Sequence, residues 1–277
     1  MSAVADATGR LRYYADTMTS GEMDEHRARN GILLLPVGCF EMHGYQAGMS
    51  TDSITAQAAS EVFAREWDGR ILPPVHYTYP GASGPWPGTV SISPRETMDY
   101  LLAVIRAVLR NGFKKLVVVS SHGPNSSVLQ MVFRTVLDED GELPIHVGTT
   151  GDFYQWVEEE YGHNHREAAK YLAALYMLGR AEEMDPTASN DELAAGPSWP
   201  CASYGRLRRR GAGMAYYFLE PNQHVGRFPG LTLEDAARLA ERWKESLLEI
   251  ARGLPEDYEA FQQDMRDAMA EQPWREL

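Results

Sequence analysis

Cysteine is scarce in this sequence of 277 residues, where Cys39 and Cys201 are the only two. Two cysteines cannot build the disulfide framework of a small secreted domain, so we expect a reduced, cytoplasmic setting. No apolar run approaches the roughly 20 residues needed to span a bilayer, and the N-terminal residues lack the apolar stretch of a signal peptide. These absences exclude disulfide-stabilised and membrane-spanning classes and predict a soluble protein.

Basic residues are also outnumbered, because 26 Lys and Arg stand against 39 Asp and Glu, a net charge of −13. A field of that sign repels phosphate backbones, so we expect no nucleic-acid partner. Hydrophobic residues make up 44% and charged residues 23%, which is typical of a globular chain. Repeats and low-complexity tracts are missing as well. The sequence predicts one domain over residues 1–277, with a long unpatterned loop at 185–213.

Short apolar runs alternate with helical patterns along the chain. Strands are predicted over residues 31–37, 71–76, 114–120 and 144–148, and helices over 52–67, 94–110, 127–137 and 164–178, with a last helix that is capped at 232–235 and ends at 253. Nearly continuous apolar strands are typical of parallel strands buried on both faces. Strand and helix alternation implies right-handed crossovers. The predicted fold class is α/β, a three-layer α/β/α sandwich with a mainly parallel sheet.

Side chains of metal-ligand type follow two of the predicted strands. Glu41 and His43 come after the first strand, Asp52 opens the next helix, and His122 comes after the strand at 114–120. Ligands of parallel α/β sheets bind at the carboxyl ends of the strands. Carboxylates and imidazoles together suit zinc, manganese or iron. The four residues predict a metal site at this edge of the sheet.

Each of these residues also has an ordinary interpretation. Asp52 sits where an N-cap belongs, and Asp is among the commonest N-caps. Glu41 and His43 are compatible with a solvated loop, and His122 with a hydrogen bond to a turn carbonyl. Taken singly, the ordinary interpretation is favoured for each residue, whereas for the four together the ordinary interpretation and a metal site are about equally supported by the spacing alone.

Three motifs in this region resemble those of the creatininase family. Residues 36–44 (PVGCFEMHG), with Thr51-Asp52 after them, are similar to the family pattern P-x-G-x-x-E-x-H-G followed by T-D. Residues 84–91 (GPWPGTVS) resemble its F-P-G-T-L-S element, and 121–125 (SHGPN) its N-G-H-G-G-N stretch. The match runs in order from about residue 33 to 137. The resemblance implies a creatininase-like α/β/α fold and a metal-dependent hydrolase.

The resemblance also implies a site for two divalent ions (Zn, Mn or Fe). Glu41 and His122 would hold one ion, His43 and Glu167 the other, and Asp52 would bridge both. Two cations at such a site would acidify a water molecule that serves as the nucleophile.

A further, weaker motif supplies Glu167 and a proton-transfer residue. Residues 162–169 (GHNHREAA) resemble the family pattern H-A-G-x-x-E-T-S, which implies His163 as the catalytic proton carrier and Glu167 as a catalytic metal ligand. The stretch is one residue short and ends in Ala-Ala, so His165 is a rival for the histidine role. The other interpretation is a capped helix, with Asn164 as N-cap and Glu167 completing a capping box.

Substrate and assembly are less closely defined. In creatinine hydrolase an acidic residue that helps to bind substrate stands where this sequence has Pro124, so we expect a small polar, cyclic substrate other than creatinine, cleaved at a C–N bond. One alternative is ring-opening C–C hydrolysis of a cyclic keto-polyol of the 3-dehydro-inosose type at the same metals. Another is a non-catalytic Rossmann-like binding or assembly subunit, disfavoured because no G-x-G-x-x-G follows the first strand.

The resemblance implies a homo-oligomer, a hexamer in similar family members. The run Arg206–Arg210 suits an anionic substrate, a neighbouring subunit or solvated surface.

Overall fold

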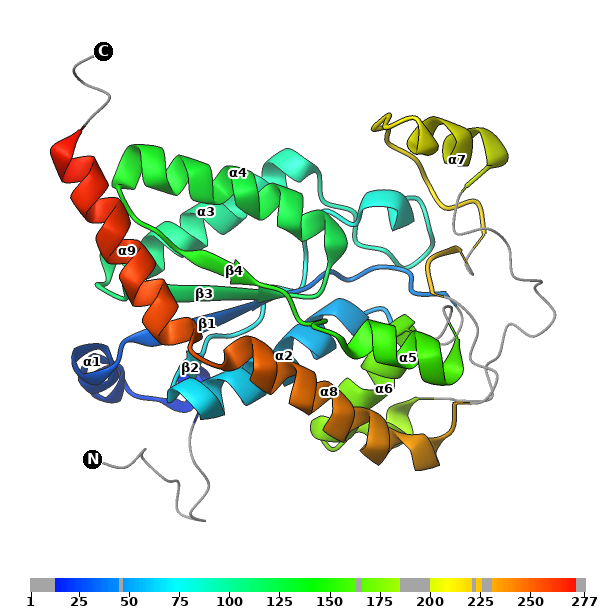
Figure 1. Cartoon of the computed structure of the whole chain (residues 1–277), viewed down its shortest axis with the longest axis horizontal. Helices are drawn as coiled ribbons and strands as arrows, with labels where there is room; N and C mark the ends of the chain where they lie inside the picture. The colour runs from blue at the N-terminus through cyan, green and yellow to red at the C-terminus, as the bar shows by residue number, and fades with distance from the viewer. Residues whose placement is uncertain are drawn as a thin grey trace.

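A parallel sheet lies at the centre of the molecule. The computed structural model describes residues 13–44, 47–162, 166–184, 200–220, 223–225 and 231–272. Its strands are β1 (Ile32–Val37), β2 (Arg70–Ile71), β3 (Lys115–Ser120) and β4 (Ile145–Val147). They pair in the order β2-β1-β3-β4, and every pair is parallel (Figure 1). β1 and β3 are therefore neighbours with their carboxyl ends at the same edge.

Helices cover both faces of this sheet. Successive residues of a strand point to opposite faces, so Leu33 and Leu35 of β1 join one apolar cluster and Leu34 joins the other. The first cluster is closed by α3 (Pro94–Arg110) and α4 (Gly123–Asp140), and the second by α2 (Thr51–Trp67), α5 (Phe153–Tyr161), α6 (Arg166–Met177) and α8 (Ala236–Ala251). Figure 1 shows the two helical layers above and below the strands. The predicted α/β/α sandwich with a parallel sheet is confirmed.

The strand predicted over residues 71–76 is wrong in its extent. β2 ends at Ile71, and only Val75 returns to the sheet, through an isolated bridge to Val37. The residues between them include Pro73 and Pro74, which have no N–H to donate to a ladder. Proline therefore splits the expected strand into two short contacts with β1.

Two helix starts also differ from the prediction. α2 begins at Thr51 with Ser50 as its N-cap residue, so Asp52 is not the N-cap but stands in the first turn. α4 begins at Gly123 rather than near 127, and Pro124 lies in its first turn, where a missing N–H costs nothing. The capping box of Ser93 and Glu96 on α3 is confirmed. The second correction brings the start of α4 directly next to His122.

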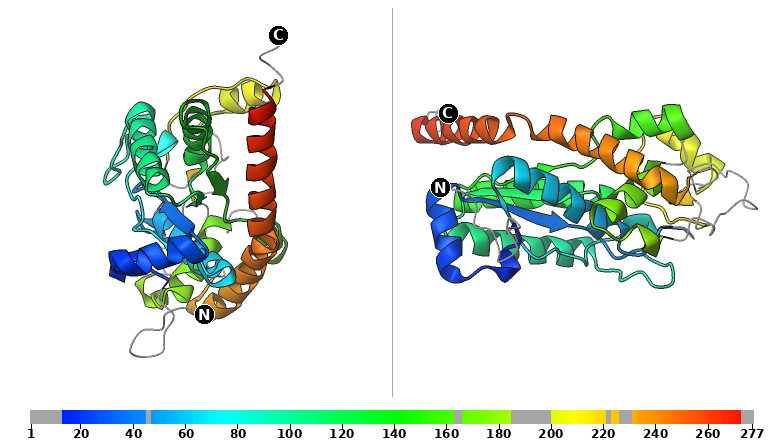
Figure 2. Two further views of the ribbon diagram at one scale, coloured as in Figure 1. Left: turned by 90° about the vertical axis from the view of Figure 1, so that its left-hand side faces the viewer. Right: turned by 90° about the horizontal axis from the view of Figure 1, so that it is seen from below.

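Several helices were not predicted at all. They are α1 (Ser20–Arg29), α5, α7 (Ala202–Arg209) and α9 (Leu254–Glu271). α7 lies in the stretch expected to be unpatterned, whose residues 185–199 are outside the described part. α8 ends near the predicted position, but Gly253, with φ 71°, leads directly into α9. α8 and α9 follow each other along one side of the molecule (Figure 2).

α9 is fixed to the sheet by polar side chains. Tyr258 Oη donates to the Leu143 carbonyl at 2.7 Å, and Gln262 Nε2 donates to the Lys114 carbonyl at 2.8 Å. Both carbonyls lie within two residues of the start of a strand, so α9 braces the end of the sheet opposite the predicted site. Among the described helices, none is long and apolar enough to cross a membrane.

Candidate metal centre

The predicted ligands come together where β1 and β3 end. The loop after β1 carries Glu41 and His43, the first turn of α2 carries Asp52, and His122 lies two residues after the end of β3 and immediately before α4. Gly38 allows this approach, because a Cβ at that position would lie 2.3 Å from Ser53 Oγ and 2.4 Å from Ser53 N of α2. A side chain there would push the start of α2 away from the strand end.

These four side chains are buried and in contact. His122 Nδ1 lies 2.9 Å from Asp52 Oδ2 and 3.2 Å from Glu41 Oε1. His43 Nε2 lies 3.5 Å from Asp52 Oδ1. All four residues are at most 6% exposed as side chains. Asp52 thus stands between the two histidines, and Glu41 reaches the same group from the loop.

The second ring nitrogen of each histidine donates a hydrogen bond to a backbone carbonyl. His122 Nε2 donates to the Tyr79 carbonyl at 2.8 Å, and His43 Nδ1 donates to the Glu41 carbonyl at 3.1 Å. A carbonyl accepts only, so the other nitrogen of each ring faces the carboxylates. Metal-binding histidines are typically oriented in this way. The turn-carbonyl interpretation of His122 is therefore correct for one nitrogen and leaves the other for a ligand.

The charges of the cluster are strongly coupled. Burial favours the neutral forms, but His122 and His43 hold the pKa of Asp52 well below its usual range. Against the same burial, Asp52 raises the pKa of His43 to about 9, and Asp52 and Glu41 raise that of His122 well above its usual range. Buried carboxylates require positive charge nearby. Either protonated histidines or a bound cation can supply that charge.

One buried oxygen of the cluster has no protein partner. Glu41 is 1% exposed, yet its Oε2 receives no hydrogen bond from any described residue. A buried carboxylate oxygen without a hydrogen-bond partner costs free energy of folding, unless a cation binds it. Carboxylate oxygens with imidazole nitrogens form a donor set that suits Zn²⁺ and Mn²⁺. The residues present therefore fit a divalent metal.

Glu167 lines the same cavity from α6. Its carboxylate lies 3.3 Å from Nζ of the buried Lys170. Burial raises the pKa of Glu167, but Lys170 and the Tyr154 hydroxyl outweigh it and hold the pKa below its usual value. Glu167 thus shares the cavity with the cluster, and its described ion pair is with Lys170. His163 and His165, with Asn164 between them, lie outside the described residues.

Sequence reasoning missed His224. Its Nδ1 donates to the Met42 carbonyl at 2.6 Å, while Nε2 faces Glu41 Oε1 at 3.7 Å. Its ring centre lies 4.3 Å from that of His43. Burial, followed by the charge of His43, lowers the pKa of His224. His224 repeats the orientation of the other two histidines, and with Glu41 and His43 it forms a group able to hold a metal ion.

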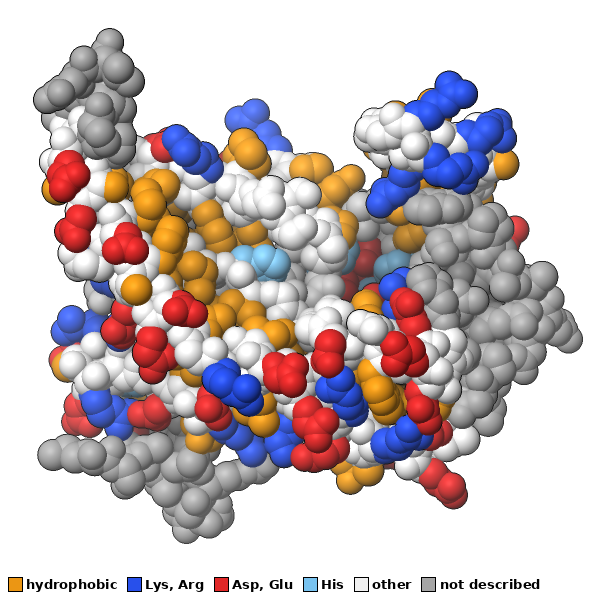
Figure 3. All heavy atoms as spheres, viewed as in Figure 1, with side chains coloured by type: hydrophobic (Ala, Val, Ile, Leu, Met, Phe, Trp, Pro, Cys, Tyr) orange, Lys and Arg blue, Asp and Glu red, His pale blue; other side chains and the backbone are white. Residues whose placement is uncertain are grey.

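A cavity of about 650 Å³ opens over this group. Figure 3 shows the hollow below α7, with acidic and histidine side chains visible inside it. Beyond the candidate ligands it is lined by Tyr79, Pro124 and Ser121, and on the far side by Tyr204, Arg208, Met214, Tyr216 and Phe218. Arg206–Arg210 are exposed, and among them Arg208 lines the cavity. A cavity of this volume is typical of small-molecule sites.

Known proteins are similar to this chain in sequence and in fold. The family model Creatininase (Creatinine amidohydrolase) matches residues 16–199. The chain is 30% identical over 111 residues to 3-dehydro-scyllo-inosose hydrolase of Thermotoga maritima, covering 40% of this chain and 36% of that one. It is 29% identical over 100 residues to creatinine amidohydrolase of Pseudomonas putida, covering 34% and 38%. These alignments span less than half the length of either relative.

Solved creatininases extend the similarity to the whole fold. One described as Creatininase Mn superposes with a TM-score of 0.68, and a mutant of Zn-Zn type with 0.70, each at 17% identity over 89% of this chain. The superposition covers 99% and 98% of those chains. The names of these relatives describe hydrolases, and the two solved creatininases are named with Mn and Zn, in agreement with the expected metal-dependent hydrolase. Because the family model matches more than half of the sequence, this chain belongs to the creatininase family.

Proposed function

We propose that the protein is a hydrolase that works with two divalent metal ions. The observation that carries this proposal is the convergence of three carboxylates and three histidines on one cavity. Glu41 and His122 are assigned to one ion, His43 and Glu167 to the other, and Asp52 to the position between them. Bound divalent ions supply Lewis acidity and make a nucleophile available near neutral pH.

The chain's own residues position and protonate the substrate. Asp52 orients His43 and His122 through contacts to both rings, and the aromatic wall narrows access of water to the cavity. His163 is assigned to proton transfer to the leaving group, since a histidine titrates near neutral pH. These roles account for orientation of the histidines, restricted access of water and proton transfer in the proposed reaction.

The proposed substrate is a small polar, cyclic molecule cleaved at a C–N bond. Pro124 lines the cavity at the position where an acidic residue would recognise creatinine, and proline has no polar side chain to do so. The pocket volume of about 650 Å³ lies within the range of small-molecule sites. Creatinine itself is therefore not the expected substrate.

A second candidate is hydrolysis of a C–C bond in a cyclic keto-polyol. The similarity to the Thermotoga maritima inosose hydrolase favours it. The two reactions differ in the atom that leaves, which is nitrogen in one and carbon in the other, and both need a proton donor. A panel of lactams, formamides and inososes separates them, because only one class is expected to turn over.

Metal content is the first expected result. Protein purified without chelator should contain about two divalent ions per chain, measured by elemental analysis. Removal of the ions should abolish turnover, and their return should restore it. Absence of Zn, Mn, Fe and Co, with no activation on adding them, would contradict the proposal and favour a binding or assembly subunit.

Assembly gives a second expected result. The run Arg206–Arg210 is exposed, and Leu207 within it is an apolar residue that is 47% exposed. A helix that presents both charge and apolar surface suits contact with another subunit. Light scattering should therefore return a multiple of the chain mass of 31.0 kDa. A mass of one chain at micromolar concentration would contradict a homo-oligomer.

A further inference from the structure

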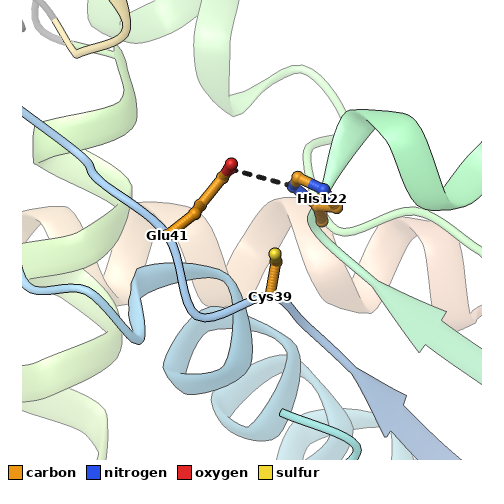
Figure 4. A group of neighbouring side chains, drawn as sticks. All are labelled: Cys39, Glu41 and His122. Atoms are coloured by element: carbon orange, nitrogen blue, oxygen red, sulfur yellow. Dashed lines mark ion pairs between the residues drawn. The ribbon is translucent and has the colours of Figure 1, made fainter. Parts of the chain in front are cut away.

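Cys39 lies against the candidate metal centre. It is fully buried, and its Sγ, a Glu41 carboxylate oxygen and a His122 ring nitrogen all lie within 4.8 Å of one another. Figure 4 shows the thiol and the two other side chains directed toward a common point. Cys39 contributes to neither of the two apolar clusters formed by the described residues. Its neighbours are polar ligand atoms, which is unusual for a cysteine that merely fills space.

The backbone fixes the direction of this thiol. The Gly38 carbonyl, next to Cys39, accepts hydrogen bonds from Thr78 Oγ1 at 2.7 Å and Asn125 Nδ2 at 3.2 Å. Cys39 Sγ itself makes a contact of 3.6 Å with the Thr78 carbonyl, and S–H is only a weak donor. The backbone thus holds the thiol in place. If the sulfur binds another partner, only this weak hydrogen bond is lost.

We propose that Cys39 is a thiolate ligand of the metal ion assigned to Glu41 and His122. The inference rests on the proposed metal-dependent function and adds sulfur to a donor set otherwise made of oxygen and nitrogen. The unpaired and buried Glu41 Oε2 is an independent sign that a cation belongs at this point. On binding, the S–H proton passes to solvent and a sulfur–metal bond forms, with no change of oxidation state.

A thiolate changes which metal the site prefers. Cysteine sulfur is a soft ligand that selects zinc, whereas manganese favours oxygen ligands. The position shared by Cys39, Glu41 and His122 is therefore a zinc site, and the position of His43 and Glu167, which has only oxygen and nitrogen donors, accepts either ion. The two positions then differ in identity although they share Asp52.

Cobalt absorption tests this directly. Metal-free protein titrated with Co²⁺ should show visible ligand-field bands together with a near-ultraviolet sulfur-to-cobalt charge-transfer band. Cys39→Ser should lose the charge-transfer band and keep the ligand-field bands. Cys201→Ser is the matched control, because Cys201 is the exposed second cysteine, and it should keep both.

The outcomes separate this inference from the function on which it rests. Ligand-field bands without a charge-transfer band in the unaltered protein would overturn the role of Cys39 and leave the metal site intact. No cobalt spectrum at all would overturn both. A charge-transfer band that persists in Cys39→Ser would also overturn the assignment.

Metal competition gives a second readout. Cys39→Ser should lower zinc affinity by at least about tenfold, the scale on which even indirect partners of a metal act, while manganese affinity changes little. Cys39→Ala should behave in the same way, which guards against a compensating bond from serine, and circular dichroism should confirm that both variants fold. An equal change for the two metals would overturn the proposed zinc preference.

Discussion

Asp52→Asn is expected to abolish measurable turnover and to strip metal from a protein that still folds. Asn has the shape of Asp but is neutral, so it cannot balance two cations. Asp52 contacts both His122 and His43, and the loss therefore affects both metal positions. Turnover should fall by more than the roughly 100-fold typical of an outer-sphere partner. Elemental analysis and a turnover assay measure the two effects.

Folding should be affected far less. Asp52 lies in the first turn of α2 and is not its N-cap residue, so the helix loses a favourable charge worth at most about 2 kcal/mol. Glu96→Gln is the matched control, because Glu96 is also acidic in a first turn but belongs to the capping box of α3. It should keep metal and turnover. Full turnover and full metal content in Asp52→Asn would refute the bridging role.

His163→Asn should lower turnover about 100-fold or more while leaving metal content nearly unchanged, as expected for loss of a general acid or base. Glu167→Gln should instead lower the occupancy of one metal, and excess metal in the assay should restore part of the activity. Because Glu167 lies beside the buried Lys170, thermal unfolding must be followed in parallel. A metal effect that appears without loss of folding separates a ligand from a partner of Lys170.

His165→Asn is the control for this pair and should be tolerated. The reverse result, with His165→Asn inactive and His163→Asn normal, would show that His165 is the histidine of the motif and that the one-residue gap lies on the other side of it. If both variants are active, the stretch is only a capped helix, and His224 becomes the residue to test for proton transfer, because its Nε2 faces Glu41 in the same cavity.

The sheet was predictable because its central strands are distinctive. β1 and β3 are almost wholly buried, and strands buried on both faces need continuous apolar runs. The failures have physical causes as well. Pro73 and Pro74 ended a strand that hydrophobicity alone would extend, and Gly253 marked the end of one helix without showing that the next begins at once.

The predicted cluster at the strand ends followed from the topology. Glu41 and His122 approach each other because β1 and β3 are adjacent and parallel, which the order of elements already implied. His224 was not predictable, because it reaches Met42 across 182 positions of the sequence and lies in no motif. Its place depends on tertiary packing, which local patterns do not encode. The thiol of Cys39 was visible in the sequence, but its direction was not.

The two walls of the cavity come from separate stretches of the chain. The family model ends at residue 199, whereas the wall facing the ligands is built by Tyr204, Tyr216 and Phe218. Mutations in that wall reshape the space offered to a substrate and leave the ligand carboxylates untouched. After gene duplication, homologues can therefore come to act on different substrates by the same hydrolytic chemistry. Shared ancestry then predicts the type of reaction better than it predicts the substrate.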